Sequence, residues 1–333
     1  MQKIGKQTIK FDLPPVITNV ASIVGPKEAN GPLAKYFDQC LEDEFWGEKT
    51  WEKSESKIIK ETVNMAISKS GVPSSNIEFC FAGDLLNQCI SSSFGLRELN
   101  IPFVGIFGAC STFVEGLGLG AIFTEAIAEH VLCAASSHFC SAEKQFRFPL
   151  ELGNQRPPTS QWTVTGAGAA ILSKSGKGPF ITHVTLGKIV DMGIKDANNM
   201  GAAMAPAALD TLICHLKDTG RSPSYYDAII TGDLGHIGKE ILTELALDKG
   251  YNIKSNYNDC GVMIFDKEKQ DTHSGGSGCG CCASVFSGYF FKQLKDQKIK
   301  RILLIATGAL MNSTSSQQGE SIPSIAHAIS IEM

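Results

Sequence analysis

Cys110, in the tetrapeptide Gly108-Ala109-Cys110-Ser111, has the strongest chemical potential in the sequence. It follows an apolar run at 103–107 and precedes a Gly/Ala/Leu-rich segment, so we expect it on a tight turn between a buried strand and a helix. Backbone N–H groups and the helix dipole would point at the sulfur there and lower its pKa. The position suits a covalent nucleophile, a neutral site that grips a carboxylate, or a small residue in a crowded turn.

A second cysteine-rich segment, Cys279-Gly280-Cys281-Cys282, ends a glycine-rich stretch that starts at Gly275. Its C-x-x-C spacing, with His273 upstream, resembles half of a zinc site. Structural zinc normally takes a second ligand pair, and the sequence has no second C-x-x-C, so we expect no metal site. The stretch is not followed by Gly-Lys-Ser/Thr, so nucleotide hydrolysis has no support.

The other candidates are polar or small residues that directly follow predicted strands. In an open parallel α/β sheet, sites form beyond the carboxyl ends of the strands, so these residues should converge on one cleft. The structural alternative is a helix cap for each Asp and turn geometry for each Gly. The candidates are Asp84, Ser137, His138, Asp233 and Gly308, together with Ser111 beside Cys110, Cys281 and Cys282 in the second cysteine segment, and His236 a turn beyond Asp233.

Alternating helix and strand patterns position these candidates. Apolar residues recur at helical spacing from Ile59 to Ile67; Ser56 can cap this helix, and Gly71 followed by Pro73 ends it. Strands are predicted at 77–82, 103–107, 131–135, 163–172 and 226–231, and a further helix at about 203–217. This alternation favours an α/β class with a parallel sheet that is covered on both faces.

The chain also repeats itself. Gly83-Asp84-Leu85 recurs as Gly232-Asp233-Leu234 at an offset of 149 residues, and the glycines around Cys110 recur around Cys282 at an offset of 172. Two echoes in the same order indicate an internal duplication. The predicted halves are residues 1–175, which carry Cys110, and residues 176–333, which carry the turn from Gly275 to Cys282.

Length and composition exclude several classes of protein. The 333 residues match two domains of about 150 residues each. A net charge of −4 gives no electrostatic support to nucleic-acid binding. We expect no signal peptide, because the first residues lack an apolar core, and no membrane span, because no uncharged apolar run approaches ~20 residues. Eleven cysteines, an odd number within apolar segments, favour a reducing compartment over a disulfide scaffold.

Longer motifs resemble the thiolase superfamily and, within it, the stage V sporulation protein AD family of endospore-forming bacteria, over essentially the whole chain. The closer resemblance rests on residues 83–88, 138–143, 145–150, 162–169 and 322–328. Cys110 falls on the acylated cysteine of the superfamily. The resemblance implies two duplicated α/β halves, each a mixed sheet, in a layered αβαβα arrangement.

The catalytic set of that superfamily is incomplete in this sequence. Thiolases carry a base His in a Gly-His-Pro-x-Gly turn, where this chain has Gly280-Cys281-Cys282-Ala283-Ser284. The synthases take their His from a strand end that here ends in Asp233, and the second thiolase cysteine is missing after Ala306. A thiol is a poor base near neutral pH, and a nucleophile without its base loses most of its rate.

The resemblance therefore implies a non-enzymatic protein that binds dipicolinic acid (pyridine-2,6-dicarboxylic acid), with calcium, for uptake into the developing spore and release at germination. It also implies a homodimer, attached peripherally at the spore inner membrane beside the other proteins of the same transport complex. We expect the helix start at Cys110 to hold one carboxylate and the turn from Gly275 to Cys282 to hold the other. No resident cofactor is expected.

Two alternatives stay open. The first is an active acyltransferase for acyl-coenzyme A or acyl-carrier substrates, with Cys110 as nucleophile and His236 or Asp233 as base. The second is an assembly module whose pocket is vestigial.

Overall fold

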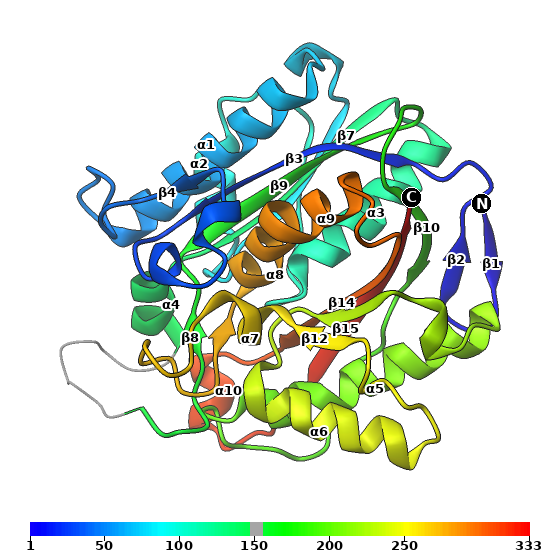
Figure 1. Ribbon diagram of the computed structural model, residues 1–333. Coiled ribbons are helices and arrows are strands. Elements are labelled where there is room, and N and C mark those ends of the chain that lie inside the picture. Colours follow the sequence, from blue (N-terminus) through cyan, green and yellow to red (C-terminus); the bar gives the residue numbers. More distant parts are fainter. Residues whose placement is uncertain (147–155) are drawn as a thin grey trace.

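In a computed structural model, which describes residues 1–146 and 156–333, thirteen strands form one mixed β-sheet and two short strands form a separate pair (Figure 1). Up to residue 173 the elements are β1 (Gln2–Ile4), β2 (Thr8–Lys10), β3 (Val16–Val24), β4 (Gln39–Cys40), α1 (Trp51–Ser70), β5 (Phe79–Gly83), α2 (Ile90–Leu96), β6 (Phe103–Gly105), α3 (Thr112–Ala126), β7 (His130–Ser137), α4 (Phe139–Phe146), β8 (Trp162–Thr163) and β9 (Gly166–Ser173). From residue 180 they are β10 (Phe180–Thr185), α5 (Met200–Thr219), β11 (Ala228–Thr231), α6 (Gly235–Asp248), β12 (Tyr257–Asp259), α7 (Cys260–Ile264), β13 (Gly276–Ser277), α8 (Cys279–Val285), a π-helical turn η6 (Phe286–Phe290), α9 (Phe291–Lys295), β14 (Arg301–Ala309), α10 (Ser313–Gln317) and β15 (Ser324–Glu332).

The strand order repeats along the chain. The first set of strands is ordered β3-β9-β7-β5-β6 and the second β10-β15-β14-β11-β12. In both sets the first two pairings are antiparallel and the last two are parallel, so the sheet is mixed and the all-parallel pattern predicted from periodicity is corrected. The sets meet at one residue pair, Phe180 with Val16. A repeated order is what a duplication produces, while a domain boundary at residue 175 stays a prediction.

Helices and strands alternate in five layers. Helices α1 and α2 pack outside the first set of strands, and α5 and α6 pack outside the second (Figure 1). Helix α3 contacts β5 and β7 on one side and β14 and β15 on the other, and α8 lies beside it. The buried central pair α3 and α8 carries Cys110 and the second cysteine segment at its helix starts. This is the predicted αβαβα arrangement.

Helix α1 shows how local sequence sets an element's limits. Its buried stripe includes the predicted Ile59, and it ends at Ser70 because Gly71 adopts a φ of 72°, as predicted. It starts earlier than the sequence predicts, because Thr50 rather than Ser56 is the N-cap and accepts a hydrogen bond from the Lys53 N–H. Ser56 lies inside the helix, where its hydroxyl donates to a carbonyl of the preceding turn.

The predicted strand at 163–172 is divided into two. Its first residue, Thr163, ends β8, which pairs with β13, and residues 166–172 lie in β9 of the main sheet. Because β13 holds Gly276 and Ser277, the small β8–β13 pair brings the glycine-rich turn against the first half of the chain. Of the motif at 145–150, residues 147–150 lie outside the described residues.

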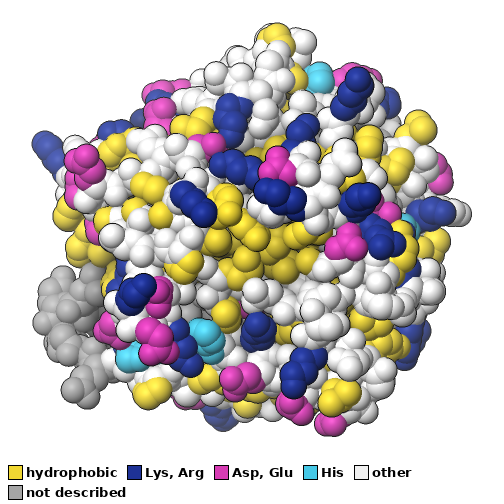
Figure 2. Space-filling view, in the orientation of Figure 1, with side chains coloured by type: hydrophobic (Ala, Val, Ile, Leu, Met, Phe, Trp, Pro, Cys, Tyr) yellow, Lys and Arg dark blue, Asp and Glu magenta, His cyan; other side chains and the backbone are white. Residues whose placement is uncertain are grey.

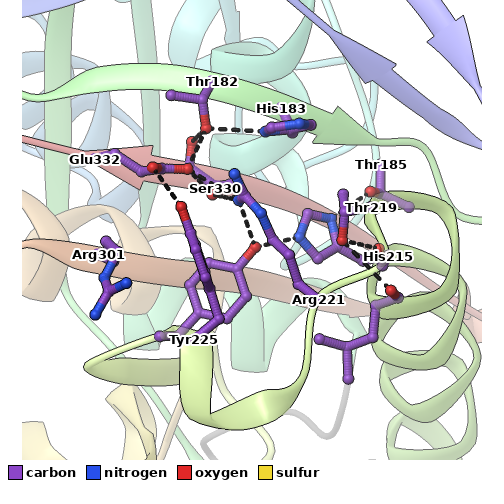
Figure 3. Close-up of polar contacts among 12 residues, drawn as sticks. Thr182, His183, Thr185, His215, Thr219, Arg221, Tyr225, Arg301, Ser330 and Glu332 are labelled. Atoms are coloured by element: carbon purple, nitrogen blue, oxygen red, sulfur yellow. Dashed lines mark hydrogen bonds and ion pairs between the residues drawn. The ribbon is translucent and has the colours of Figure 1, made fainter.

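A buried polar network fixes α5 against β10 and β15 (Figure 3). His215 of α5 bonds through Nδ1 to the Thr185 hydroxyl at 2.8 Å and through Nε2 to the Tyr226 hydroxyl at 2.5 Å. Arg221 forms an ion pair with Glu332 at 2.9 Å. Burial lowers the pKa of His215 to about 3, so the ring is neutral at physiological pH. These contacts assign His215 to the scaffold.

Charged side chains of both signs are spread over the face that Figure 2 shows, with hydrophobic side chains gathered near its centre over α8. All eleven cysteines are free thiols. No helix in the described parts of the chain combines the length and the apolar character that crossing a membrane requires.

Candidate functional site

A narrow pocket opens beside Cys110 between the two halves of the chain. Its empty space, the open mouth included, is about 490 Å³, although only about 50 Å³ can take the centre of a water molecule. The smaller figure lies far below the roughly 300–1,000 Å³ of usual small-molecule sites, so the pocket admits only a small, thin ligand. The described lining consists of Leu85, Phe107, Ala109, Cys110, Ala142, Thr163, Met200, Ser277, Ala309 and Met311.

The turn that carries Cys110 is held rigidly from both sides. Ala109 adopts a φ of 50°, which is unfavourable for a residue with a side chain. The Thr112 hydroxyl accepts from the Gly108 N–H and donates to the Ala109 carbonyl, and the Cys279 thiol donates to the same carbonyl at 3.0 Å. The turn therefore presents the sulfur at a fixed position in the pocket.

The thiol of Cys110 is protonated rather than activated. Its side chain is 6% exposed, and burial raises its pKa well above the usual value. The nearby charge of Asp233 raises this pKa further, while Ser277, whose Oγ lies 3.7 Å from the sulfur, and the Gly278 N–H lower it slightly. The predicted lowering of the pKa by the helix start is wrong, because desolvation and a negative neighbour outweigh the dipole.

Asp233 lies at the end of β11 behind the sulfur, as its strand-end position predicts. The carboxyl group is fully buried and accepts hydrogen bonds from the Ser277 hydroxyl at 2.9 Å, the Gly278 N–H at 3.1 Å and the Thr307 hydroxyl at 2.8 Å. Burial raises its pKa, and these donors together with the Cys110 thiol partly offset the rise.

The two histidine candidates lie away from the sulfur. His138 is buried, and its Nε2 bonds to the Glu44 carbonyl at 2.8 Å. His236 lines a separate surface hollow together with His273 and Lys267. Placing His236 in the cleft is therefore corrected: the helix after Asp233 turns its side chain outward. Within the described chain, no histidine forms a hydrogen bond to Cys110.

Three further candidates hold loops in place instead of facing the pocket. Asp84 accepts from the Leu86 N–H and from Ser92, and so orients the loop that carries Leu85 into the pocket. The Ser111 hydroxyl donates to the Gly108 carbonyl inside the turn. The Ser137 hydroxyl donates to the Val164 carbonyl. Their strand ends do converge beneath the pocket, but their polar atoms already have partners.

The last candidates are packed in the core. Cys281 and Cys282 are fully buried among apolar residues at the start of α8. Gly308 lets two backbones approach, because a Cβ there would lie 2.1 Å from the Gly108 carbonyl oxygen. These residues shape the floor of the pocket without lining it.

The glycine-rich turn does not offer the N–H groups that the sequence predicts for a carboxylate. The Gly278 N–H donates to Asp233, the Gly280 N–H to the Ser137 hydroxyl, and the Gly275 N–H to the Thr272 carbonyl. The prediction that these N–H groups bind a carboxylate is corrected accordingly. The polar side chains that remain in the described lining are Cys110, Thr163 and Ser277.

Sequence reasoning missed most of the pocket wall. Leu85 and Phe107 lie inside motifs that the sequence singles out, and Ser277 lies inside the glycine-rich turn. These three lining residues could therefore have been predicted from the sequence. Met200 and Met311 come from the second half of the chain and follow no chemical pattern. Only the tertiary fold brings them to Cys110.

The chain matches one known protein family along nearly its whole length. A family model described as Stage V sporulation protein AD (SpoVAD) matches residues 5–332. The chain is 41% identical to Stage V sporulation protein AD of Bacillus subtilis (strain 168) over 333 residues, which cover 100% of this chain and 98% of that protein.

Solved structures share the fold at low sequence identity. The 3-oxoacyl-[acyl-carrier-protein] synthase III of Aquifex aeolicus VF5 is 12% identical with a TM-score of 0.59, covering 96% of this chain and 100% of that one. Acetamide-bound OleA of Xanthomonas campestris is 13% identical with a TM-score of 0.60, covering 98% of this chain and 100% of that one. These likenesses confirm the predicted thiolase-like fold class and carry no more than the fold.

Proposed function

The chain belongs to the stage V sporulation protein AD family, and from that premise we propose that it binds dipicolinic acid in the Cys110 pocket without transforming it. The bound solute would be taken up into the developing spore and released at germination. Two features support this role: the family is one of sporulation proteins, and the thiolase-like fold contains a pocket with an apolar wall.

One observation carries the non-catalytic part of the proposal. The neighbours of the Cys110 sulfur are a carboxyl group and a hydroxyl, Asp233 and Ser277, and burial keeps the thiol protonated. Acyl transfer needs a thiolate together with a base that accepts its proton. A protonated thiol beside a buried acid is a poor nucleophile but a usable hydrogen-bond donor.

The shape and polarity of the pocket support a flat aromatic ligand. Leu85, Phe107 and Met311 supply apolar surface for a ring, while Cys110, Ser277 and Thr163 supply polar atoms that fix its orientation. No Lys or Arg lines the described part of the pocket, so the two negative charges of the ligand need another source of compensation. Calcium travelling with the ligand as its chelate would provide it, as cargo rather than as a resident cofactor.

Two measurements separate this function from the alternatives. Calorimetry with pyridine-2,6-dicarboxylate should give saturable binding, and the isomeric 2,4-dicarboxylate should bind much more weakly. Equal or absent heats for the two isomers would contradict the proposal and leave the assembly module. Mass spectrometry after incubation with acyl-coenzyme A should show an unmodified Cys110, whereas an acyl adduct would support the acyltransferase.

The exposed edge of the sheet supports the proposed homodimer. Strand β6 pairs only with β5 in the described sheet, and Phe103 and Val104 on it are 40% and 38% exposed. Open strand edges with apolar side chains tend to pair with another chain. We propose that two copies meet along β6.

Substitution of Val104 by Asp should convert the dimer to a monomer, because two buried carboxylates would then face each other across the pairing. Light scattering during gel filtration measures the mass. Ile127→Asp, at an apolar residue that is more exposed (62%) and lies outside β6, is the control and should stay dimeric. A Val104→Asp dimer would exclude β6 from the interface.

We further propose a peripheral position at the spore inner membrane, beside the other proteins of the same transport complex. The ground for this placement is the resemblance to the family, and no helix in the described residues could cross a membrane. Fractionation of spores should find the chain with the inner membrane and release it with high salt or alkali, but not retain it as an integral protein.

A further inference from the structure

The floor of the Cys110 pocket holds a buried carboxyl group and, in the described residues, no positive charge. The carboxyl belongs to Asp233, whose hydrogen-bond partners are uncharged donors: Cys110, Ser277, Gly278 and Thr307. An anionic ligand above this floor would face a second anion in a region of low dielectric constant, where like charges repel strongly. Binding of an anion therefore requires that the negative charge of Asp233 be neutralised.

When Asp233 is ionised, the donors that face the pocket are turned toward it. The Ser277 hydroxyl donates to Asp233 Oδ2 at 2.9 Å, and the Cys110 thiol interacts with the same carboxylate. A hydroxyl and a thiol have one proton each to donate. Neither proton is then available to a ligand.

One proton on Asp233 reverses this arrangement. The protonated carboxyl becomes a donor, and the Ser277 oxygen can accept from it while its own proton turns into the pocket. The Cys110 thiol is released differently: the neutral carboxyl is a weaker acceptor than the carboxylate, so the thiol proton can turn to a stronger, anionic acceptor in the pocket. The Cys110 sulfur and the Ser277 hydroxyl oxygen lie 3.7 Å apart, so together they offer two adjacent donors to the oxygens of one ligand carboxylate.

We propose that the pocket binds a carboxylate of its ligand together with one proton, which comes from the solvent and is held on Asp233. This inference rests on the proposed function and names what regulates that site. Lower pH loads Asp233 in advance, so affinity for the free dicarboxylate rises as the pH falls. A calcium chelate brings its own compensating charge and does not need the proton.

The other titratable groups around Asp233 also favour its protonated form. Asp259, at the end of the neighbouring strand β12, interacts with Asp233, and burial raises the pKa of Asp259 to about 7. Negative charge on Asp259 makes an ionised Asp233 less favourable. The thiols of Cys110 and Cys281, which also face Asp233, are kept neutral because burial raises their pKa values.

Calorimetry of the wild-type chain tests this coupling directly. The titrant is calcium-free pyridine-2,6-dicarboxylate at pH 7.5, where isolated carboxylates are ionised, in two buffers of different ionisation enthalpy. We expect an uptake of up to one proton per ligand, in proportion to the fraction of Asp233 that is ionised in the free chain, and an affinity that falls by up to about tenfold per pH unit between pH 6 and 8. Binding with no dependence on the buffer would overturn the inference alone. Absence of binding in both buffers and at pH 6 would overturn the proposed function as well.

Variants locate the proton. Asp233→Asn keeps the size of the side chain but cannot ionise, so proton uptake should vanish and the affinity should no longer change with pH. Asp227→Asn, at an exposed residue just before the same strand, should behave as wild type. Uptake that persists in Asp233→Asn would overturn the assignment. Should that variant not fold, Thr307→Val removes one donor to Asp233 and should raise affinity at pH 7.5; an unchanged affinity would contradict the inference.

Discussion

Cys110 occupies a position where a helix start should activate a thiol, and its surroundings cancel that effect. The sulfur is almost fully buried, and its polar neighbours are Asp233 and Ser277. Thiolate reactivity depends on the fraction of deprotonated thiol, which burial and a neighbouring carboxylate both reduce. The same residue type at the same turn therefore becomes a hydrogen-bonding group.

Native alkylation should spare Cys110. We expect iodoacetamide at pH 7.5 to modify Cys40 at least about tenfold faster than Cys110, because Cys40 is exposed while Cys110 is buried. The pKa of Cys40 is itself raised, but that of Cys110 is raised well above its usual value, and each unit lowers the thiolate fraction tenfold. Peptide mass spectrometry follows both sites, and alkylation in denaturant should remove the difference. Faster modification of Cys110 in the folded protein would show an activated nucleophile.

The residue types at the site were predictable only in part. Cys110 and Asp233 follow predicted strands, and their positions on one edge of the sheet follow from the topology. The direction of the Cys110 pKa was not predictable, because it depends on how deeply the fold buries the sulfur. His236 illustrates the same limit, since one turn of helix decides whether a side chain faces the cleft or the hollow beside Lys267.

Among the elements, the helix limits depended on capping contacts that compete locally. Thr50 and Ser56 are both suitable caps by type, and the structure selects Thr50 because its hydroxyl accepts from the Lys53 N–H. Apolar spacing defines the middle of a helix better than its start. The split of the predicted 163–172 strand has a comparable cause, because β8 pairs with β13, which lies more than 100 residues away in the sequence.

Removing the cap should weaken α1 measurably. Thr50→Ala is expected to reduce the free energy of unfolding by about 1 kcal/mol, the usual cost of a lost N-cap. Ser56→Ala is the matched control and should change it by less than about 0.5 kcal/mol, because its hydroxyl bonds to a carbonyl inside the helix. Urea unfolding compares the two variants. A larger loss for Ser56→Ala would contradict the assigned helix start.

At the scale of the whole molecule, the duplication is seen in the repeated strand order and not in sequence identity between the halves. The short echoes around Asp84 and Asp233 predict a repeated unit, and the two sets of strands share order and direction. The pocket lies between these units, with Leu85 from one and Met200 from the other. No local pattern could join those two residues, because their contact depends on how the units pack.

Several carboxyl groups are buried, and their burial makes the stability of the fold depend on pH. Burial raises the pKa of Glu28 to about 8 and that of Asp259 to about 7. Both groups hold protons in the folded chain that the unfolded chain has already lost above about pH 5. Their stabilising contribution is therefore complete below the unfolded pKa values and is lost as the pH rises through 7 and 8.

Thermal unfolding should accordingly begin at lower temperature at pH 9 than at pH 7. Glu28→Gln keeps the acceptor for the Thr165 N–H but cannot ionise, so it should flatten this dependence. Glu42→Gln, at an exposed glutamate of the same region, should leave the slope unchanged. Stability that increases from pH 7 to pH 9 would contradict the assigned protonation of the buried acids.

A crystal structure of the chain with pyridine-2,6-dicarboxylate tests the central claim most directly. The account predicts the aromatic ring against Leu85 and Phe107, one carboxylate within hydrogen-bond distance of the Cys110 sulfur and the Ser277 hydroxyl, and no covalent bond to the sulfur. Density for the ligand in the hollow around His236, or joined covalently to Cys110, would contradict it.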